Sequence, residues 1–197
     1  MLKLKEFMHD IVHNEIFGAV KAYVWRIEWQ VSCCICGQNP QLMCLAGTGT
    51  PTLHALIILK DKILSARHID DVTSAELPDP IADPELFELV IQHMLHVRCD
   101  ENDSVSCRRD DHGRVCDCKR FFPKEACTST IIVPDGYPKY RRRCQHTATL
   151  PGGRIVSDNW VVPHNRYLLL KYRAHCNVEI CAHFKSFKYV YKYAFKA

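Results

Sequence analysis

Two segments that favour β-structure constrain the fold of this chain more than any other feature of its sequence. Residues 20–29, VKAYVWRIEW, are rich in β-branched and aromatic side chains, which is the composition of a strand. Residues 53–60, LHALIILK, form a compact apolar run, typical of a central strand buried on both faces. The intervening residues 31–50 show no clear hydrophobic period, so we expect a loop there. The sequence therefore predicts a strand–loop–strand unit as the first element of the core.

Apolar residues at helical spacing predict two helices. Residues 3–16 carry their apolar side chains on one helical face, and Phe17–Gly18 would end that helix. Residues 84–96, PELFELVIQHMLH, begin with proline, which is favoured at the first position of a helix. The acidic, proline-containing residues 69–86 are expected to form surface turns. Three further segments are predicted more coarsely: 137–143 as a basic strand or loop edge, 155–172 as two extended pieces or a strand running into a helix, and 176–196 as a segment with a helix at its end.

The charge of the chain is unevenly distributed, although the net charge is only +4. Residues 139–197 contain 12 Lys and Arg but only two acidic residues. We expect this basic part to face a polyanion, with a merely solvated basic face as the alternative. No apolar run approaches the roughly 20 residues that a membrane-spanning helix needs, and residues 1–17 do not resemble a signal peptide. We therefore expect an intracellular protein that makes no contact with membranes.

Twelve cysteines are a high count for such a chain, and eight of them fall into two sets. The first set is Cys33, Cys34, Cys36 and Cys44, and the second is Cys99, Cys107, Cys116 and Cys118, with His96 nearby. Without a signal peptide we do not expect a disulfide framework. Neither set contains two CxxC pairs, so the spacing alone is weak evidence for zinc. For the second set, within an irregular lobe at 96–127, a zinc site and a group of free thiols remain open alternatives.

The chain ends in a basic, tyrosine-rich segment, KSFKYVYKYAFKA. In a helix Tyr189 and Tyr193 share a face with the neighbouring lysines, whereas in a strand Tyr191 would join them. One interpretation is an amphipathic element that packs its rings beneath the lysine stems. The other is that the phenols are nucleophiles acting on an anion that the lysines hold.

Several segments of the chain together resemble one known family. They are FGAVKAYVWRIEWQ, DDVTSAELPDPIADPELFELVIQHMLH, KRFFPK, GYPKYRRR, DNWVVPHNRYLLLKYRAHCNVEIC and KYVYKYAFK. In order and spacing these segments resemble the Helitron helicase-like domain, the Rep-type nuclease portion of Helitron transposases. The resemblance extends over nearly the whole chain apart from residues 31–50.

This resemblance implies an α+β fold of the HUH type. A central antiparallel sheet with flanking helices would carry two histidines on its central strand, and a nearby helix would carry two tyrosines four residues apart. The histidines of the family hold Mg²⁺ or Mn²⁺, and a tyrosine attacks single-stranded DNA to leave a 5′ phosphotyrosine. KYVYKY supplies Tyr189 and Tyr193 as the catalytic residues, with Tyr191 left to pack. Residues 1–197 would form a single domain with a small irregular Cys-rich lobe.

On the metal side the chain departs from the family. Alignment on Pro51 places Thr52 at the position of the first histidine and His54 at the second. The two positions share a face of a strand, but a threonine hydroxyl is a poor ligand for a divalent cation. Glu28 or Gln30 on the adjacent strand could complete the site, and Glu28 is the better choice because it is anionic. The segment 31–50 is also sixteen residues longer than the corresponding segment of the family. We interpret the extra residues as a relic of decay or as an unspliced segment.

Three functions follow as alternatives. The first is nicking and transfer of DNA strands in rolling-circle transposition, degenerate because of Thr52. The second is a catalytically inactive remnant that still binds single-stranded DNA, and the third is a relic without a DNA role. The expected DNA-binding residues are Arg141, Arg142, Arg143, Lys185, Lys188 and Lys192. The chain has no G-x-x-x-x-G-K-[ST] loop, so it is not a helicase by itself. The resemblance implies a helicase domain in the full-length protein and a nuclear location.

Overall fold

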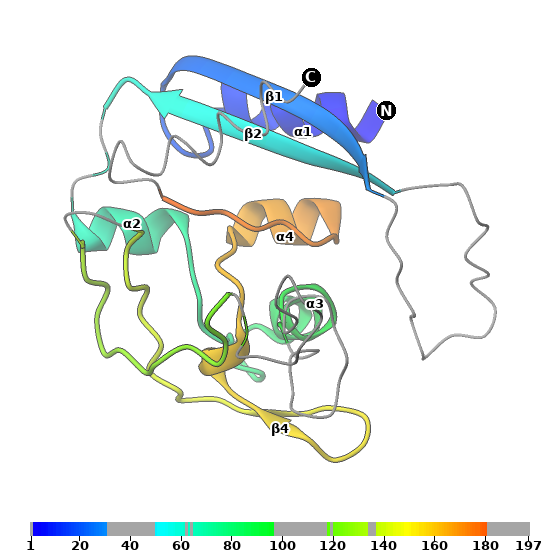
Figure 1. The fold of residues 1–197 in the computed structure, drawn as a ribbon, viewed down its shortest axis with the longest axis vertical. Coiled ribbons are helices and arrows are strands. Elements are labelled where there is room, and N and C mark those ends of the chain that lie inside the picture. Colours follow the sequence, from blue (N-terminus) through cyan, green and yellow to red (C-terminus); the bar gives the residue numbers. More distant parts are fainter. Residues whose placement is uncertain are drawn as a thin grey trace, which may run out of the picture. The chain divides into compact units, whose positions relative to one another are not determined.

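The computed structural model describes residues 2–30, 50–61, 63, 65–96, 118, 120–133 and 137–180. The described chain has the predicted α+β class, with helices and two antiparallel strand pairs (Figure 1). It divides into two compact units, the first containing the described residues 2–61 and the second the described residues from 63 to 180. Residues 31–49, and most of the predicted Cys-rich lobe at 97–117 and 119, lie outside the described part. No helix of the described residues is long and apolar enough to cross a membrane.

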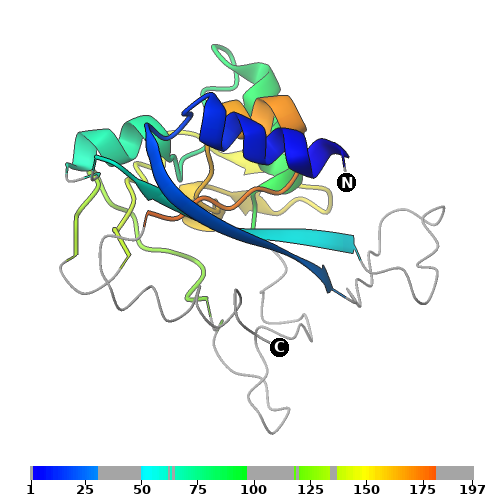
Figure 2. The ribbon, with the colours of Figure 1, turned by 90° about the horizontal axis from the view of Figure 1, so that it is seen from above.

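A long antiparallel strand pair dominates the first unit. Strand β1 (Val20–Gln30) pairs with β2 (Thr50–Leu59) along its whole length, from Val20 opposite Leu59 to Gln30 opposite Thr50. Figure 2 shows the pair as one twisted ribbon. The predicted strands are confirmed, but Ile58 is 41% exposed and β1 is the only described strand paired with β2. Burial of β2 on both faces, the expectation from its apolar run, is therefore wrong for the described residues.

The N-terminal helix α1 (Leu2–His13) belongs to the same unit and lies beside the strand pair in both views (Figures 1 and 2). Its side chains Met8 and Ile11 are buried, in agreement with the predicted apolar face. The helix ends three residues earlier than predicted. A turn then follows, in which the Gly18 amide donates to the carbonyl of Glu15 at 2.7 Å and Gly18 adopts φ +107°. Glu15, with φ +50°, is already in the left-handed region, so the chain leaves the helical conformation before Gly18.

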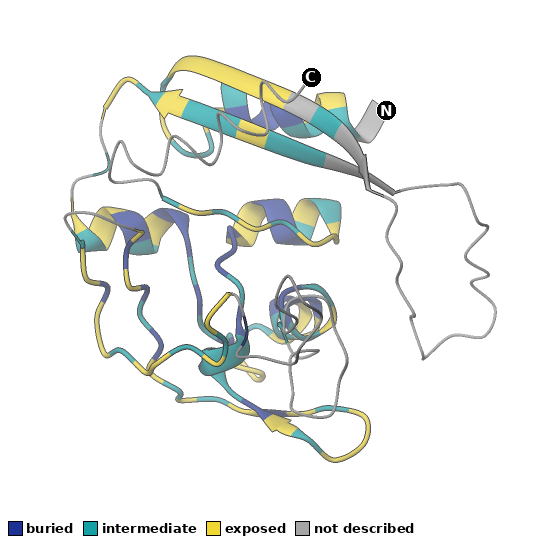
Figure 3. Cartoon of the chain, in the orientation of Figure 1, coloured by how far each residue is buried: buried dark blue, intermediate teal, exposed yellow. Residues whose placement is uncertain are grey.

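The second unit has its main core between helices α3 (Pro84–His93) and α4 (Arg166–Tyr172). The buried side chains of this core are Leu77, Leu86, Leu89, Val90, Met94, Val161 and Leu169, and Figure 3 shows the buried faces of both helices. Helix α3 begins at the predicted proline but ends before residue 96. It ends there because the Met94 carbonyl accepts from the Val162 amide at 2.7 Å and Leu95 forms a bridge with Val161. Tertiary pairing thus replaces the last predicted helical turn.

A third helix, α2 (Ala66–Val72), occupies part of the segment predicted as turns. The Ser65 hydroxyl caps it by accepting from the amide of His68 at 3.1 Å. Ile69 is fully buried in a second cluster with Ala75 and Tyr140. The turn prediction for 69–86 is therefore wrong at its start, because burial of one apolar face stabilises a short helix.

The remaining strands of the second unit are short. Strand β3 (Ala148–Thr149) pairs with β4 (Ile155–Val156), which runs through the 3₁₀ helix η2 (Asp158–Trp160) towards α4. Of the two alternatives for 155–172, the strand that runs into a helix is confirmed. The basic residues 137–143 form isolated bridges, Lys139 with Ile131 and Arg142 with Cys127. They are thus an extended edge, as predicted.

Candidate functional site

The register of β1 and β2 determines what surrounds the predicted metal position. Glu28 lies opposite Thr52, and Arg26 lies opposite His54. Directly opposite positions of an antiparallel pair have Cβ atoms about 5 Å apart. The prediction that Glu28 belongs to the strand next to Thr52 and His54 is therefore confirmed for the backbone. The arginine opposite His54 was not predicted, because the sequence does not determine which residues of the two strands pair.

His54 is the member of this group whose side chain the structure describes. Its ring is half-buried, and its Nε2 atom is shielded from solvent. For Glu28, Thr52 and Arg26 the structure describes the backbone alone. The described residues contain no group of three or more His, Cys, Asp or Glu side chains that could hold a metal ion.

Several predicted site residues lie outside the described part of the chain. They are the catalytic candidates Tyr189 and Tyr193, the DNA-binding candidates Lys185, Lys188 and Lys192, and the zinc candidates Cys99, Cys107 and Cys116. Their roles stay predictions from the sequence.

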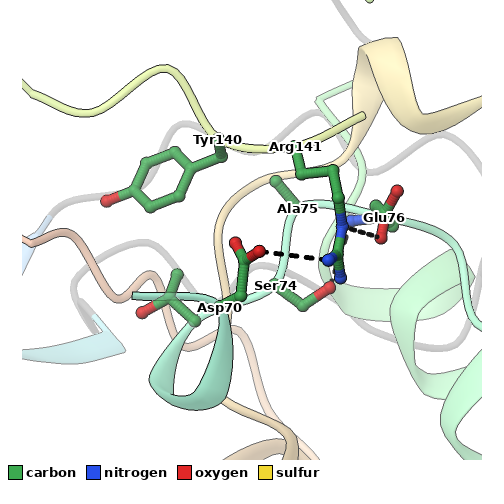
Figure 4. A pocket seen from close by; sticks show the side chains of 7 residues that line it. Asp70, Ser74, Ala75, Glu76, Tyr140 and Arg141 are labelled. Carbon is green, nitrogen blue, oxygen red and sulfur yellow. Dashed lines mark hydrogen bonds and ion pairs between the residues drawn. The ribbon is translucent and has the colours of Figure 1, made fainter. Parts of the chain in front are cut away.

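Arg141 and Arg143 form ion pairs with acidic side chains of the second unit. Arg141 contacts Asp70 and Glu76, both at 3.0 Å, and Figure 4 shows its guanidinium between the two carboxylates. Arg143 donates to both oxygens of Glu76 at 2.8 and 2.9 Å. Burial alone would raise the pKa of Glu76, but hydrogen bonds from Arg143 and Arg141 lower it below its ordinary value. The carboxylate of Glu76 therefore stays ionised and binds both Arg141 and Arg143.

Arg142 has a different environment from its two neighbours. It is 3% exposed, and its Nη1 atom donates to the carbonyl oxygens of Ala75 at 3.1 Å, of Val161 at 2.8 Å, and of Asp158. Burial lowers the pKa of this guanidinium below its ordinary value. Since backbone carbonyls enclose the side chain, the structure gives Arg142 a structural role in place of the predicted contact with DNA. DNA binding by Arg141 and Arg143 stays a prediction.

Asp158 has a buried carboxylate, and the sequence predicted no role for it. One of its oxygens accepts from the amide of Leu77 and the other from the amide of Cys144, both at 2.7 Å. Burial raises its pKa, while the two backbone hydrogen bonds act in the opposite direction. Like Arg142, Asp158 forms hydrogen bonds with backbone groups. It therefore stabilises the fold and is not part of a reactive site.

One histidine–cysteine pair in the second unit brings together two groups that can bind metals. Nε2 of His96 lies 3.3 Å from Sγ of Cys118, although the residues are 22 positions apart. Cys118 belongs to the second cysteine set, and it is the one member of that set within the described residues.

Comparison with known proteins adds no relative. A scan against protein-family models finds no match, and a search of curated proteins finds no similar sequence. The likeness to the Helitron domain therefore rests on the sequence segments quoted above.

Proposed function

We propose that the chain is a degenerate DNA-strand nicking and transfer domain of the Helitron Rep type. The observation that carries the proposal is the β1–β2 register, which brings the position of Glu28 opposite Thr52, two residues from His54. An antiparallel pair with this pattern is what the resemblance requires of the metal-binding strand and its neighbour. An HUH fold and a nuclear site of action belong to the same proposal.

The chemistry assigned to the tyrosines is transesterification. The phenol oxygen of Tyr189 or Tyr193 bonds to the scissile phosphorus, and the bond from phosphorus to the 3′ oxygen breaks. The phenol loses its proton, the 3′ oxygen gains one, and the 5′ phosphate remains on the tyrosine. Lysines beside the phenols favour the reactive phenolate and offset the charge of the phosphate.

The residues at the metal position do not fit the two-histidine site of the family. Thr52 offers a neutral hydroxyl, and His54 and Glu28 provide one nitrogen and one carboxylate donor. Position 26, opposite His54, is a cation, which disfavours a divalent ion nearby. This observation favours the second candidate, a protein that binds single-stranded DNA and does not cut it.

Covalent trapping on single-stranded DNA tests the proposal. The chain is incubated with a labelled oligonucleotide and Mg²⁺ or Mn²⁺, and adducts that survive denaturing electrophoresis are measured. We expect little or no adduct from the unaltered chain. We expect adduct formation after Thr52→His with sixteen residues of 31–50 removed, and its loss when Tyr189→Phe and Tyr193→Phe are added.

The remaining outcomes separate the alternatives. Efficient cleavage by the unaltered chain would contradict the damaged metal site. Salt-dependent DNA binding by every variant, without an adduct from any, would support the inactive DNA-binding remnant. The absence of both binding and cleavage would favour a relic with no DNA role.

A further inference from the structure

The turn that contains Phe121 and Phe122 presents one of its two phenyl rings to solvent. Phe121 is 78% exposed, whereas Phe122 is half-buried and its ring stacks on that of His96 with a centroid separation of 4.4 Å. Burial of apolar area is what makes a phenylalanine stabilise a fold. Phe122 therefore attaches the turn to the second unit, while the ring of Phe121 contributes little to its packing.

The backbone of Phe121 is in an unfavourable conformation. Its φ is +56°, in the left-handed region that bulky side chains rarely adopt. The Phe121 amide donates to the carbonyl of Cys118 at 2.7 Å, and the Lys124 amide donates to the carbonyl of Asn159 in η2 at 2.8 Å. These bonds hold the turn in place although the conformation suits glycine better than phenylalanine. Local strain of this kind is typical of functional positions.

Two cations lie beside the exposed ring. Arg120 is exposed, and Nζ of Lys124 donates to the Arg120 carbonyl at 2.7 Å and lies 5.8 Å from the centroid of Phe121. Glu125, the next acidic residue along the chain, forms an ion pair with Lys139 at 3.7 Å. The ammonium of Lys124 thus lies over one face of the ring, and the high exposure of Phe121 leaves room for a planar ligand on the other face.

We propose that Phe121 stacks on a base of single-stranded DNA, with Arg120 and Lys124 attracting the neighbouring phosphates. Aromatic rings that stack on bases, beside cations that attract the backbone, are how proteins bind single strands without reading their sequence. In a duplex the bases are already stacked on one another, so the ring selects single strands. The inference rests on the proposed function, because it takes single-stranded DNA as the substrate and adds a contact that holds it.

Binding to three labelled probes tests the stacking contact. The intact chain is titrated, without a divalent metal, against an oligothymidylate, an abasic oligomer of the same length and a duplex, and fluorescence anisotropy is measured. We expect Phe121→Gly to weaken binding of the oligothymidylate by at least about fivefold, with nearly unchanged affinity for the abasic oligomer and the duplex. Phe121→Tyr keeps an aromatic ring and should bind the oligothymidylate like the wild type.

Thermal unfolding separates binding from packing. Glycine adopts a positive φ without steric cost, so Phe121→Gly should unfold at the same temperature as the wild type or at a higher one. Arg120→Gln should weaken binding to all three probes and reduce its dependence on salt. Tyr167→Ala is the matched control, because Tyr167 is 45% exposed and also lies beside a lysine, with Nζ of Lys171 5.8 Å from its centroid. We expect it to bind every probe normally.

Several results would overturn the stacking contact and leave the proposed function standing. They are equal affinity of Phe121→Gly and the wild type for the oligothymidylate, an equal loss of affinity in Tyr167→Ala, and a lower unfolding temperature of Phe121→Gly without loss of binding. A wild-type chain that binds none of the probes would contradict both this inference and a role in DNA binding. Covalent trapping tests strand nicking separately, because the anisotropy experiment requires neither a metal nor the tyrosines.

Discussion

Arg26 lies directly opposite His54 in the antiparallel register of β1 and β2. A positive charge at this position opposes any divalent cation that His54 would help to bind. Repulsion between a guanidinium and a divalent cation that lie several ångströms apart in a well-solvated site is about 1 kcal/mol after screening by salt, or roughly a fivefold loss of affinity. The register therefore indicates a second obstacle to metal binding besides Thr52.

Removal of that charge should improve metal use in a repaired chain. In the Thr52→His background with the shortened loop, we expect Arg26→Gln to lower the Mn²⁺ concentration for half-maximal adduct formation by roughly fivefold. Arg26→Lys is the control, because it keeps the charge and should leave that concentration nearly unchanged. Equal behaviour of the two variants would show that the charge at position 26 has no effect on the metal.

Arg142 should be important for stability, not for DNA affinity. Arg142→Met leaves the carbonyl groups of Ala75, Asp158 and Val161 without their shared donor, and we expect a loss of about 2–4 kcal/mol in the free energy of unfolding. Arg143→Met removes a partly exposed ion pair and should cost less than about 1 kcal/mol. Urea denaturation measures both. If Arg142→Met has normal stability but binds DNA more weakly, the result would support a contact between Arg142 and DNA.

Asp158 offers a test of the buried hydrogen bonds. In Asp158→Asn the side-chain amide can accept from only one of the two backbone amides, of Leu77 and Cys144, so we expect a loss of about 1–3 kcal/mol. Asp79 provides a comparison, because it is exposed and the backbone amides of Ile81 and Ala82 both donate to one of its oxygens, an acceptor that asparagine retains. Asp79→Asn should therefore destabilise the protein less in the same denaturation experiment. A larger effect at Asp79 would contradict the importance of burial.

His164 predicts a specific pH dependence of stability. Burial, aided by the charge of Arg142, lowers its pKa from the ordinary 6.5 to about 4, although its Nδ1 lies 3.1 Å from the Val162 carbonyl. Between these pH values the unfolded chain binds a proton that the folded chain does not. The free energy of unfolding should therefore fall as the pH is lowered from about 6.5 to about 4, by up to about 3 kcal/mol from this group.

A histidine substitution separates this contribution from those of other groups. His164→Gln should have a flatter stability profile between pH 6.5 and 4 than the wild type. His68→Gln, which changes an exposed ring on α2, is the control for the substitution itself. Thermal or urea denaturation across this range provides the measurement. An unchanged slope in His164→Gln would show that the ring binds protons equally in the folded and the unfolded chain.

Local chemistry was enough to predict four elements of the described fold, namely α1, β1, β2 and α3. β-branched and aromatic side chains identified β1 and β2, because a pleated strand accommodates them well. Pro84 marked the start of α3, because a missing amide hydrogen is harmless at the first turn of a helix. The end of α3 was misjudged, since pairing with Val161 and Val162 competes with the last helical turn and comes from residues far along the chain.

For the three consecutive arginines at 141–143, the local sequence does not predict which side chain is buried. In an extended segment alternate side chains point to opposite faces, but the sequence RRR contains nothing that says which face is buried. Packing against Ala75 and Val161 encloses Arg142, while Asp70 and Glu76 hold its neighbours nearer the surface.

The sequence by itself determined the strand pair, the approximate starts of α1 and α3, and the residue types available at the candidate site. Only the tertiary structure decided that Arg26 opposes His54, that Arg142 is buried, and that His96 meets Cys118. The physical reason is the same in each case. Propensity depends on neighbours within a few residues, whereas register and burial depend on contacts between segments whose separation along the chain leaves their alignment open.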